Sequence, residues 1–199
     1  MHTYTHTYSS QASTKLPGSS TACVAQLRSG GTLEVVNLGD SGLRLVRAGC
    51  VEFATGVQEH GWNCPYQLSH PRLVTNTDTA ADAAVDELKV APGDVIVLGT
   101  DGLWDNMWDD QLLELVGSRP GGTTSTRDGR PLKPGKGGTG ERAAAALVRR
   151  LAEAAARNAA DPWYRGPWAV ELEQHGKVRR AEGGRRVPIR FLAGLAWTR

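Results

Sequence analysis

Two aspartates stand directly after apolar stretches of the kind that form buried strands. Asp40 lies in residues 37–42, which read Asn-Leu-Gly-Asp-Ser-Gly, and Asp101 lies in residues 98–106, which read Leu-Gly-Thr-Asp-Gly-Leu-Trp-Asp-Asn. A carboxylate at the end of a rigid strand is held in a fixed place, as a metal ligand must be. Carboxylate oxygens are the ligands that hard divalent cations such as Mg²⁺ prefer. The pair of aspartates therefore predicts a cation site.

Each aspartate also has a simpler interpretation as a turn residue. Gly, Asp and Ser are ordinary turn formers, so residues 39–42 could be a hairpin turn between two strands. Asp101 and Gly102 are likewise a common turn pair, and Asp105 could cap or stabilise that turn. Taken singly, each aspartate is better explained by a turn. The pair with its flanking residues favours the cation site.

The composition is that of an ordinary globular protein. The chain has 199 residues, which is long enough for one domain with a core, and 40% of its residues are hydrophobic. No apolar run is long enough for a transmembrane helix, and the net charge of +2 gives no general attraction to nucleic acid or membrane. Cys23, Cys50 and Cys64 form no Cys-x-x-Cys pair. This pattern argues against a disulfide scaffold or a zinc site and favours a reducing compartment.

Apolar patterns and turn signals predict the secondary structure. The first half should form an antiparallel sheet, because strands are expected at hairpin spacing, at residues 21–27, 32–38, 43–48 and 51–55. Residues 57–84 have no clear period and are expected to be a long surface excursion. Two more strands are expected at residues 86–90 and 95–98, the second uniformly apolar and therefore buried on both faces. Helices are expected at residues 109–116, with Asp109 or Asp110 as N-cap, and at residues 141–158, ended by Pro162.

Composition shifts suggest the boundaries of the folded part. Residues 1–17 are interpreted as a disordered N-terminal segment; a transit peptide is the alternative, because the segment is rich in Ser and Thr and has no acid. Residues 18–170 are expected to form the folded domain, with residues 117–140 as a flexible insertion rich in Gly, Pro and Thr. Residues 171–199 are expected to be a divergent basic tail.

Three short motifs occur in the order in which one known family carries them. They are Gly-Ser-Ser-Thr-Ala at residues 18–22, Val-Asn-Leu-Gly-Asp-Ser at 36–41 and Thr-Asp-Gly-Leu-Trp-Asp at 100–105. Together they resemble the metal-dependent serine/threonine protein phosphatases, the type 2C or PPM family. Residues 58–68 and 161–167 are similar to a narrower branch, the organelle-associated T-cell-activation phosphatase relatives of plants, algae and animals. The resemblance spans residues 18–167 apart from the insertion.

The resemblance implies a fold of the α+β class, a partial αββα sandwich of two antiparallel sheets flanked by helices. It implies Mg²⁺ or Mn²⁺ as cofactor, with Asp101 as a ligand of the catalytic metal pair and Asp40 nearby, where family members bind a further, weaker metal. The implied reaction is hydrolysis of phosphoserine and phosphothreonine by metal-activated water, without a covalent intermediate. Ser19, Ser20 and Thr21 would be structural. Trp104 would pack in the core, and His60 is expected to be solvated rather than catalytic.

The resemblance also has gaps. The family's upstream Asp-Gly-x-Gly-Gly has no counterpart in residues 1–17, and the paired aspartates of its last strand are absent after Gly183 and Gly184. One of the three principal metal carboxylates is therefore present, and little or no activity is expected of this chain. A non-catalytic phosphatase-fold protein that binds or regulates partners is the alternative.

The resemblance and the charge pattern also bear on partners and compartment. A phosphoprotein substrate, a monomeric state and an intracellular location, with chloroplast or mitochondrion as options, are expected, and no membrane. Residues 177–199 hold seven Lys or Arg and one acid, Glu182. Trp163, Trp168 and Trp197 alternate with arginines in and before this tail, a combination that some proteins use to bind single-stranded nucleic acid. A solvated charge run explains it better, so no nucleic-acid partner is expected.

Overall fold

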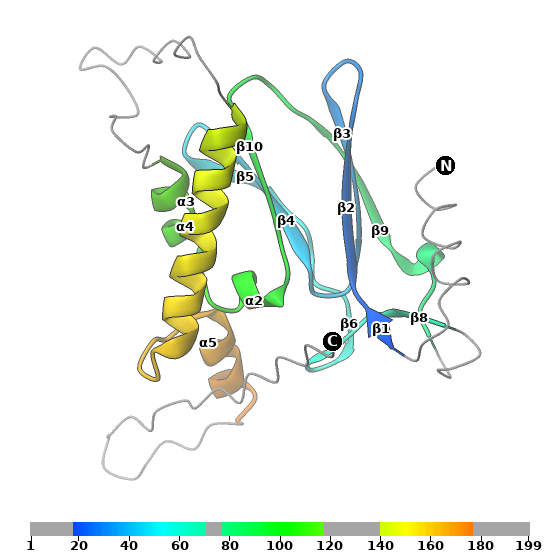
Figure 1. The fold of residues 1–199 in the computed structure, drawn as a ribbon. Helices are drawn as coiled ribbons and strands as arrows, with labels where there is room; N and C mark the ends of the chain where they lie inside the picture. The colour runs from blue at the N-terminus through cyan, green and yellow to red at the C-terminus, as the bar shows by residue number, and fades with distance from the viewer. Residues whose placement is uncertain (1–17, 71–76, 118–139, 177–199) are drawn as a thin grey trace. The chain divides into compact units, whose positions relative to one another are not determined.

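The computed structural model describes residues 18–70, 77–117 and 140–176, in two compact units that comprise Met1–Asp101 and Gly102–Arg199 (Figure 1). The predicted disordered start, the predicted insertion apart from its end residues and most of the predicted basic tail lie outside these residues. Within the described ranges, no helix has the length and hydropathy needed to cross a membrane.

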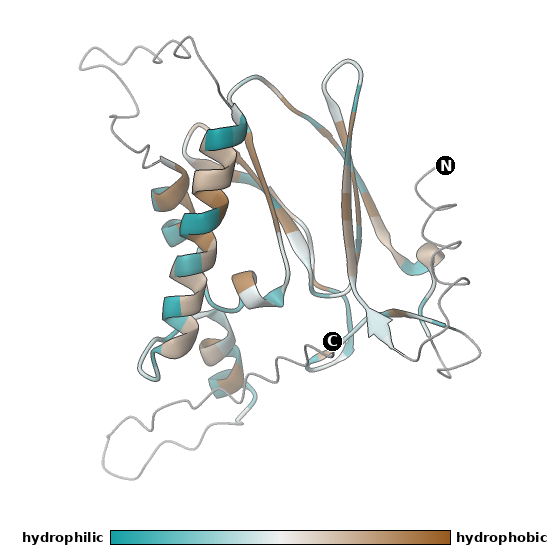
Figure 2. Cartoon of the chain, viewed as in Figure 1, coloured by the Kyte–Doolittle hydropathy of each residue, from teal (hydrophilic) through white to brown (hydrophobic). Residues whose placement is uncertain are grey.

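The first unit is a sandwich of two three-stranded antiparallel sheets. One sheet has the order β2-β3-β9, formed by Ala22–Arg28, Thr32–Leu38 and Ala84–Lys89. The other has the order β10-β4-β5, formed by Val95–Gly99, Gly42–Arg47 and Cys50–Ala54. Figure 2 shows hydrophobic residues along β4 and β10. With the helices of the second unit, these sheets confirm the predicted α+β class.

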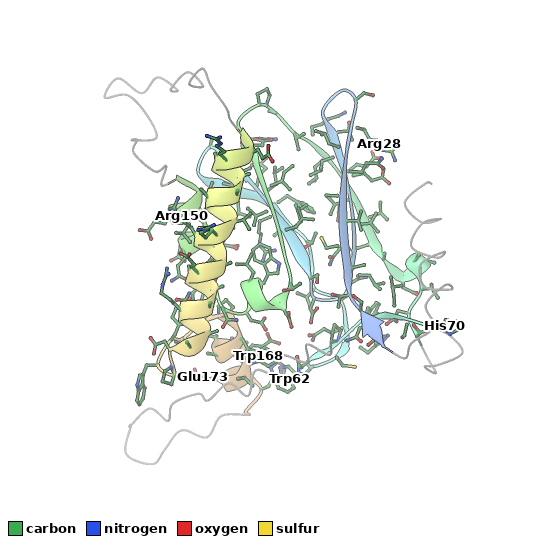
Figure 3. The ribbon with its side chains drawn as sticks, viewed as in Figure 1. Arg28, Trp62, His70, Arg150, Trp168 and Glu173 are labelled. Atoms are coloured by element: carbon green, nitrogen blue, oxygen red, sulfur yellow. The ribbon has the colours of Figure 1, made fainter. Side chains whose placement is uncertain are left out.

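The core of the sandwich follows from the two-residue period of its central strands. Leu33 and Val35 of β3 and Leu43 and Leu45 of β4 are at most 2% exposed and form one buried cluster. Glu34, between two of these core residues, points to the other face. Its carboxylate accepts a 2.7 Å hydrogen bond from Nε of Arg28 on β2 (Figure 3). Alternation along β3 therefore builds both the core and a polar outer contact.

The described parts of residues 57–84 contain more secondary structure than the lack of a period predicts. They contain the hairpin of β6 (Glu59–Gly61) and β7 (Cys64–Pro65), strand β8 (Leu68–Ser69) and the 3-10 helix η1 (Ala80–Asp82). Strand β8 pairs with β1 (Ser19–Ser20) at the start of the described chain. Strands of two or three residues are too short to show a period, which is why the sequence pattern missed them.

Strand β10 differs from its prediction in burial. Val97 is 7% exposed, but Leu98 is 46% exposed, so the strand is not buried on both faces. In the described part of the chain β10 pairs with β4 alone and is an edge strand. The uniformly apolar sequence therefore predicted the strand correctly, but not the exposure of one of its faces.

The second unit is helical. It contains most of α2 (Asp101–Trp104), together with α3 (Asp109–Gly117), α4 (Gly140–Ala160) and α5 (Pro167–Gln174). Asp109 and Asp110 lie in the first turn of α3 rather than capping it, since the backbone carbonyl of Trp108 accepts the 3.0 Å bond from the Leu112 amide. Helix α5 crosses residue 170, where the basic tail was expected to begin.

An arginine clamp ties the end of β4 to the turn before β10. The Arg47 guanidinium donates to both Asp94 carboxylate oxygens, at 2.9 and 2.8 Å, and to the Lys89 carbonyl at 2.7 Å. The Ala91 amide donates to the same carboxylate at 2.8 Å. The hydrogen bond from Arg47, aided by that amide, lowers the pKa of Asp94 to about 2. The clamp links the two sheets, because Lys89 ends β9 of the other sheet.

We expect Asp94→Asn to lower stability at neutral pH and to matter little near pH 2. The pKa of Asp94 is lower in the folded chain than its ordinary 3.8, so the carboxylate stabilises the fold above about pH 4. That contribution disappears as the pH falls through about 2. Urea unfolding of both proteins across this range measures it, and Arg47→Gln should remove the same pH dependence. An equal stability difference at every pH would contradict the assignment.

Candidate metal centre

The turn that carries Asp40 is a corner between the two sheets. Strand β3 ends at Leu38 in one sheet, and β4 begins at Gly42 in the other. The hairpin interpretation of this turn is therefore wrong, because β3 and β4 do not pair. The core makes the corner necessary, since the apolar faces of these consecutive strands are packed against each other across the sandwich.

Gly39 allows this corner because no side chain fits there. Its φ angle is +95°, in the region that favours glycine. A Cβ atom at this position would lie 2.5 Å from Cγ2 of Thr21 and 2.5 Å from the carbonyl oxygen of Tyr66. The Thr21 hydroxyl also lies 2.8 Å from the Ser41 hydroxyl, within hydrogen-bond distance. Thr21 therefore has the structural role that the family resemblance implied.

Backbone and amide hydrogen bonds fix the same corner from its other side. The side-chain amide of Asn37, which is 1% exposed, donates to the carbonyls of Gly39 and Gly56 at 3.3 and 3.2 Å. The backbone amide of Gln58 also donates to the Gly39 carbonyl, at 3.1 Å. Asn37 is a positioning residue that the sequence reasoning passed over. Its signal was an amide side chain near the end of an apolar strand, two residues before the Gly-Asp turn.

The structure brings the two predicted ligands, Asp40 and Asp101, into one electrostatic environment. Partial burial raises the pKa of Asp40, and the negative charge of Asp101 raises it further, followed by that of Glu59. Hydrogen bonds from the backbone amides of Asp40 and Ser41 oppose the shift. A carboxylate disfavoured in its charged form by neighbouring carboxylates is a place where a cation is stabilised. Glu59 was not predicted, because it lies in the aperiodic stretch.

The donor chemistry fits part of a site for Mg²⁺ or Mn²⁺. Asp40 and Asp101 offer the oxygen ligands that these ions prefer. The described ranges contain no group of three or more His, Cys, Asp or Glu side chains placed to hold a metal together. The aspartates can therefore supply carboxylates to a cation, with its remaining positions left to water or to other ligands.

Asp101 lies at a helix start rather than in a simple turn. It is the first residue of α2, directly beyond β10 and Thr100. Within the second unit, the Asn106 side-chain amide donates to the Gly102 carbonyl at 3.1 Å and closes the chain behind this short helix. The carbonyl of Asp105 accepts a 3.2 Å bond from the Trp168 amide. The segment after Asp101 is thus held by its own unit.

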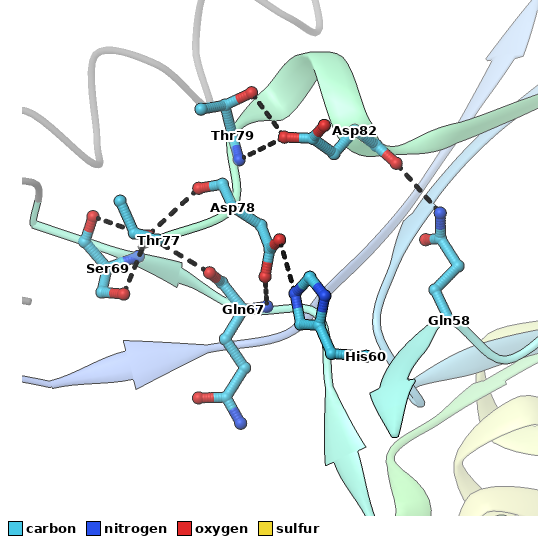
Figure 4. Close-up of polar contacts among 8 residues, drawn as sticks. All are labelled: Gln58, His60, Gln67, Ser69, Thr77, Asp78, Thr79 and Asp82. Carbon is cyan, nitrogen blue, oxygen red and sulfur yellow. Dashed lines mark hydrogen bonds and ion pairs between the residues drawn. The ribbon is translucent and has the colours of Figure 1, made fainter. Parts of the chain in front are cut away.

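His60 is exposed to solvent, as expected, but it also has partners within the first unit. Its Nε2 atom lies 2.8 Å from Oδ1 of Asp78, and its ring stacks on Tyr66 with centroids 4.2 Å apart (Figure 4). The partner is 18 residues away along the chain, and no local pattern pointed to it.

Comparisons with known proteins agree with the three motifs. The probable protein phosphatase 2C 26 of Arabidopsis thaliana is 35% identical over 159 residues, which are 80% of this chain and 45% of that protein. The probable protein phosphatase 2C 1 of Oryza sativa subsp. japonica is 32% identical over 83% of this chain and 42% of that protein. No protein-family model matches the chain.

A solved structure has the same fold. The photosystem II phosphatase PBCP superposes with a TM-score of 0.72 and 28% identity, over 88% of this chain and 59% of that one. The predicted αββα phosphatase fold, in partial form, is thereby confirmed. The chain spans less than half the length of the two plant relatives above.

We expect Gly39→Ala to destabilise the first unit by about 3 kcal/mol. An alanine there adds backbone strain of about 1–2 kcal/mol and a clash with Thr21 and the Tyr66 carbonyl. Gly49→Ala is the matched control, because Gly49 has a similar φ of +83° but nothing within 4 Å of its would-be Cβ. It should show the strain alone, about 1 kcal/mol. Denaturant unfolding measures both, and equal losses would show that the close contact at Gly39 is unimportant.

Proposed function

We propose that this chain, a protein phosphatase 2C family member in sequence and fold, is a metal-dependent serine/threonine protein phosphatase in which Asp40 and Asp101 contribute to the metal centre. The observation that carries the proposal is that the charge of Asp101, together with partial burial, raises the pKa of Asp40, which requires the two carboxylates to lie near each other. The plant relatives and the PBCP fold support the same reaction class. The substrate would be a phosphoserine or phosphothreonine side chain of a protein.

The described residues have definite tasks in such a reaction. Asp40 and Asp101 would hold Mg²⁺ or Mn²⁺, and Gly39, Asn37 and Ser41 keep Asp40 in place at the corner. A bound ion would supply an activated water and would stabilise negative charge on the phosphoryl group. The partly buried setting of Asp40 strengthens electrostatic attraction to a cation relative to bulk water.

We expect the activity of this chain to be weak. A pair of catalytic metal ions needs several carboxylates at fixed positions, and the described residues contribute no group of three donors. The alternative function is a non-catalytic, phosphatase-fold protein that binds or regulates phosphoproteins. The incomplete donor set favours this alternative, whereas the preserved Asp40 corner favours the enzyme.

Partners and compartment remain proposals. We infer a phosphoprotein substrate, a monomer and no nucleic-acid or membrane partner. The organelle-associated branch, with a chloroplast or mitochondrial location, is supported by the likeness of residues 58–68 to that branch. The expectation of no nucleic-acid partner is supported by the net charge of +2, which gives no general attraction to a phosphate backbone.

The test is hydrolysis of a phosphopeptide and an aryl phosphate by the purified chain with excess Mn²⁺. We expect slow, Mn²⁺-dependent turnover that Asp101→Ala lowers by more than about 10-fold, since even residues outside a metal's coordination shell cost that much when removed. Glu153→Ala, an exposed acid on α4, is the control and should leave turnover unchanged. Robust turnover would contradict the expectation of weak activity and would support the enzymatic function.

Calorimetry separates the two candidate functions. Mn²⁺ binding that is lost in Asp40→Ala and Asp101→Ala supports the phosphatase metal centre. No Mn²⁺ binding together with retained phosphoprotein binding would favour the non-catalytic alternative.

A further inference from the structure

We propose that His60 and Asp78 form a latch that holds the β6–β7 hairpin against the Asp40 corner, and that His60 is thereby a positioning residue for the metal centre. The latch follows from contacts within the first unit. Its consequence for metal binding rests on the proposed function.

The hairpin contacts the corner through both of its ends. At its entry, the Gln58 amide donates to the Gly39 carbonyl at 3.1 Å. At its exit, the Tyr66 carbonyl is packed so closely on Gly39 that a Cβ atom there would be 2.5 Å away. The position of the hairpin therefore sets the shape of the corner that carries Asp40.

The hairpin cannot hold this position by its own strands. β6 has three residues and β7 has two, and their pairing shifts register between Glu59 and Gly61. An isolated two-stranded hairpin is at best marginally stable in water, even when it is longer than this one. Contacts with neighbouring segments, through both backbone and side chains, supply further support.

Asp78 supplies this support by bridging both sides of the hairpin (Figure 4). Its Oδ1 atom lies 2.8 Å from Nε2 of His60 in β6, and its Oδ2 accepts a 2.7 Å bond from the Gln67 amide just after β7. Its own amide donates to the Gln67 carbonyl at 3.2 Å. The His60 ring also stacks on Tyr66, the residue whose carbonyl packs on Gly39. The latch thus acts on the two strands at once.

The latch residue Asp78 is itself fixed by neighbouring polar contacts. Ser69 donates to the Thr77 hydroxyl through its backbone amide at 2.8 Å. Thr79 and Asp82 form a capping box at η1, and the Asp82 carbonyl accepts a 2.9 Å bond from the side-chain amide of Gln58. These contacts therefore connect the segment that carries Asp78 back to Gln58 at the base of the hairpin.

The chemistry of the pair assigns the donor. A carboxylate can only accept, so Nε2 of His60 carries the proton in this contact. A neutral imidazole is sufficient for that bond. The Asp78 side chain is 12% exposed and the His60 side chain 51% exposed, so water reaches the contact only from the histidine side. A hydrogen bond to a charged group is among the stronger side-chain contacts, and its loss is measurable as faster opening of a short hairpin.

Three substitutions at one position separate the parts of the latch. His60→Gln keeps a nitrogen donor at the same number of bonds from Cα, and His60→Phe keeps an aromatic ring but no donor. His60→Ala removes both. Arg165→Ala, which removes an exposed ion pair to Glu173 in the second unit, is the control. Each full-length variant is measured for amide exchange at Tyr66 and Gln67 and for Mn²⁺ affinity by calorimetry.

We expect His60→Ala and His60→Phe to speed exchange at Tyr66 and Gln67 by about 10-fold or more, which corresponds to the loss of one such bond. Mn²⁺ affinity should fall several-fold in the same two variants, because the corner that carries Asp40 loosens. His60→Gln should stay close to wild type in both measurements, and so should Arg165→Ala.

Specific results would overturn the proposal. The latch would be contradicted if amide exchange in His60→Phe were the same as in the wild type. It would also be contradicted if exchange in His60→Gln were as fast as in His60→Ala. Faster exchange with unchanged Mn²⁺ affinity would remove the positioning role. If the wild type bound no Mn²⁺, the metal centre of the proposed function and the positioning role would both fall, while the exchange data would still decide the latch.

Discussion

The close contact of three chain segments at Gly39 is the constraint on which the rest of the first unit depends. Leu33 and Val35 of β3 must face Leu43 and Leu45 of β4 to build the core, yet these strands are consecutive in the chain. The connection must therefore change sheets within a few residues, which the positive φ of Gly39 allows. The same turn presents Asp40, so the geometry of the candidate site is a by-product of how the core closes.

The electrostatics of the corner run against folding stability. Burial and the charges of Asp101 and Glu59 disfavour the ionised form of Asp40. In the absence of a cation, a raised pKa in the folded chain means that stability is greater at low pH and declines as the pH rises through that pKa. The clustered carboxylates therefore lower the folding stability and create a negative potential at Asp40. Such a pattern is more typical of binding sites than of structural turns.

Sequence reasoning recovered what depends on local pattern and lost what depends on distant partners. The strands around Val35 and Leu45 follow from period-two alternation, and α4 follows from its helix-forming composition. The positions of Asp40 and Asp101 at strand ends were likewise readable from apolar runs followed by Gly and Asp. Burial of β10 was overestimated, because an apolar sequence does not reveal whether both faces of a strand are covered, and Leu98 is exposed.

The contacts of His60 show why the remaining part of the site was not predictable. Asp78 lies 18 residues further along, in a stretch whose strands are too short to carry a period. Such strands gain little from backbone pairing, so side-chain hydrogen bonds must fix their place, and these bonds follow from tertiary contact rather than from sequence spacing. The hairpin that contacts the Asp40 corner is therefore the element that local pattern describes least. A corner set by the core and a hairpin set by polar side chains meet at Gly39, and the conformation of Asp40 depends on both.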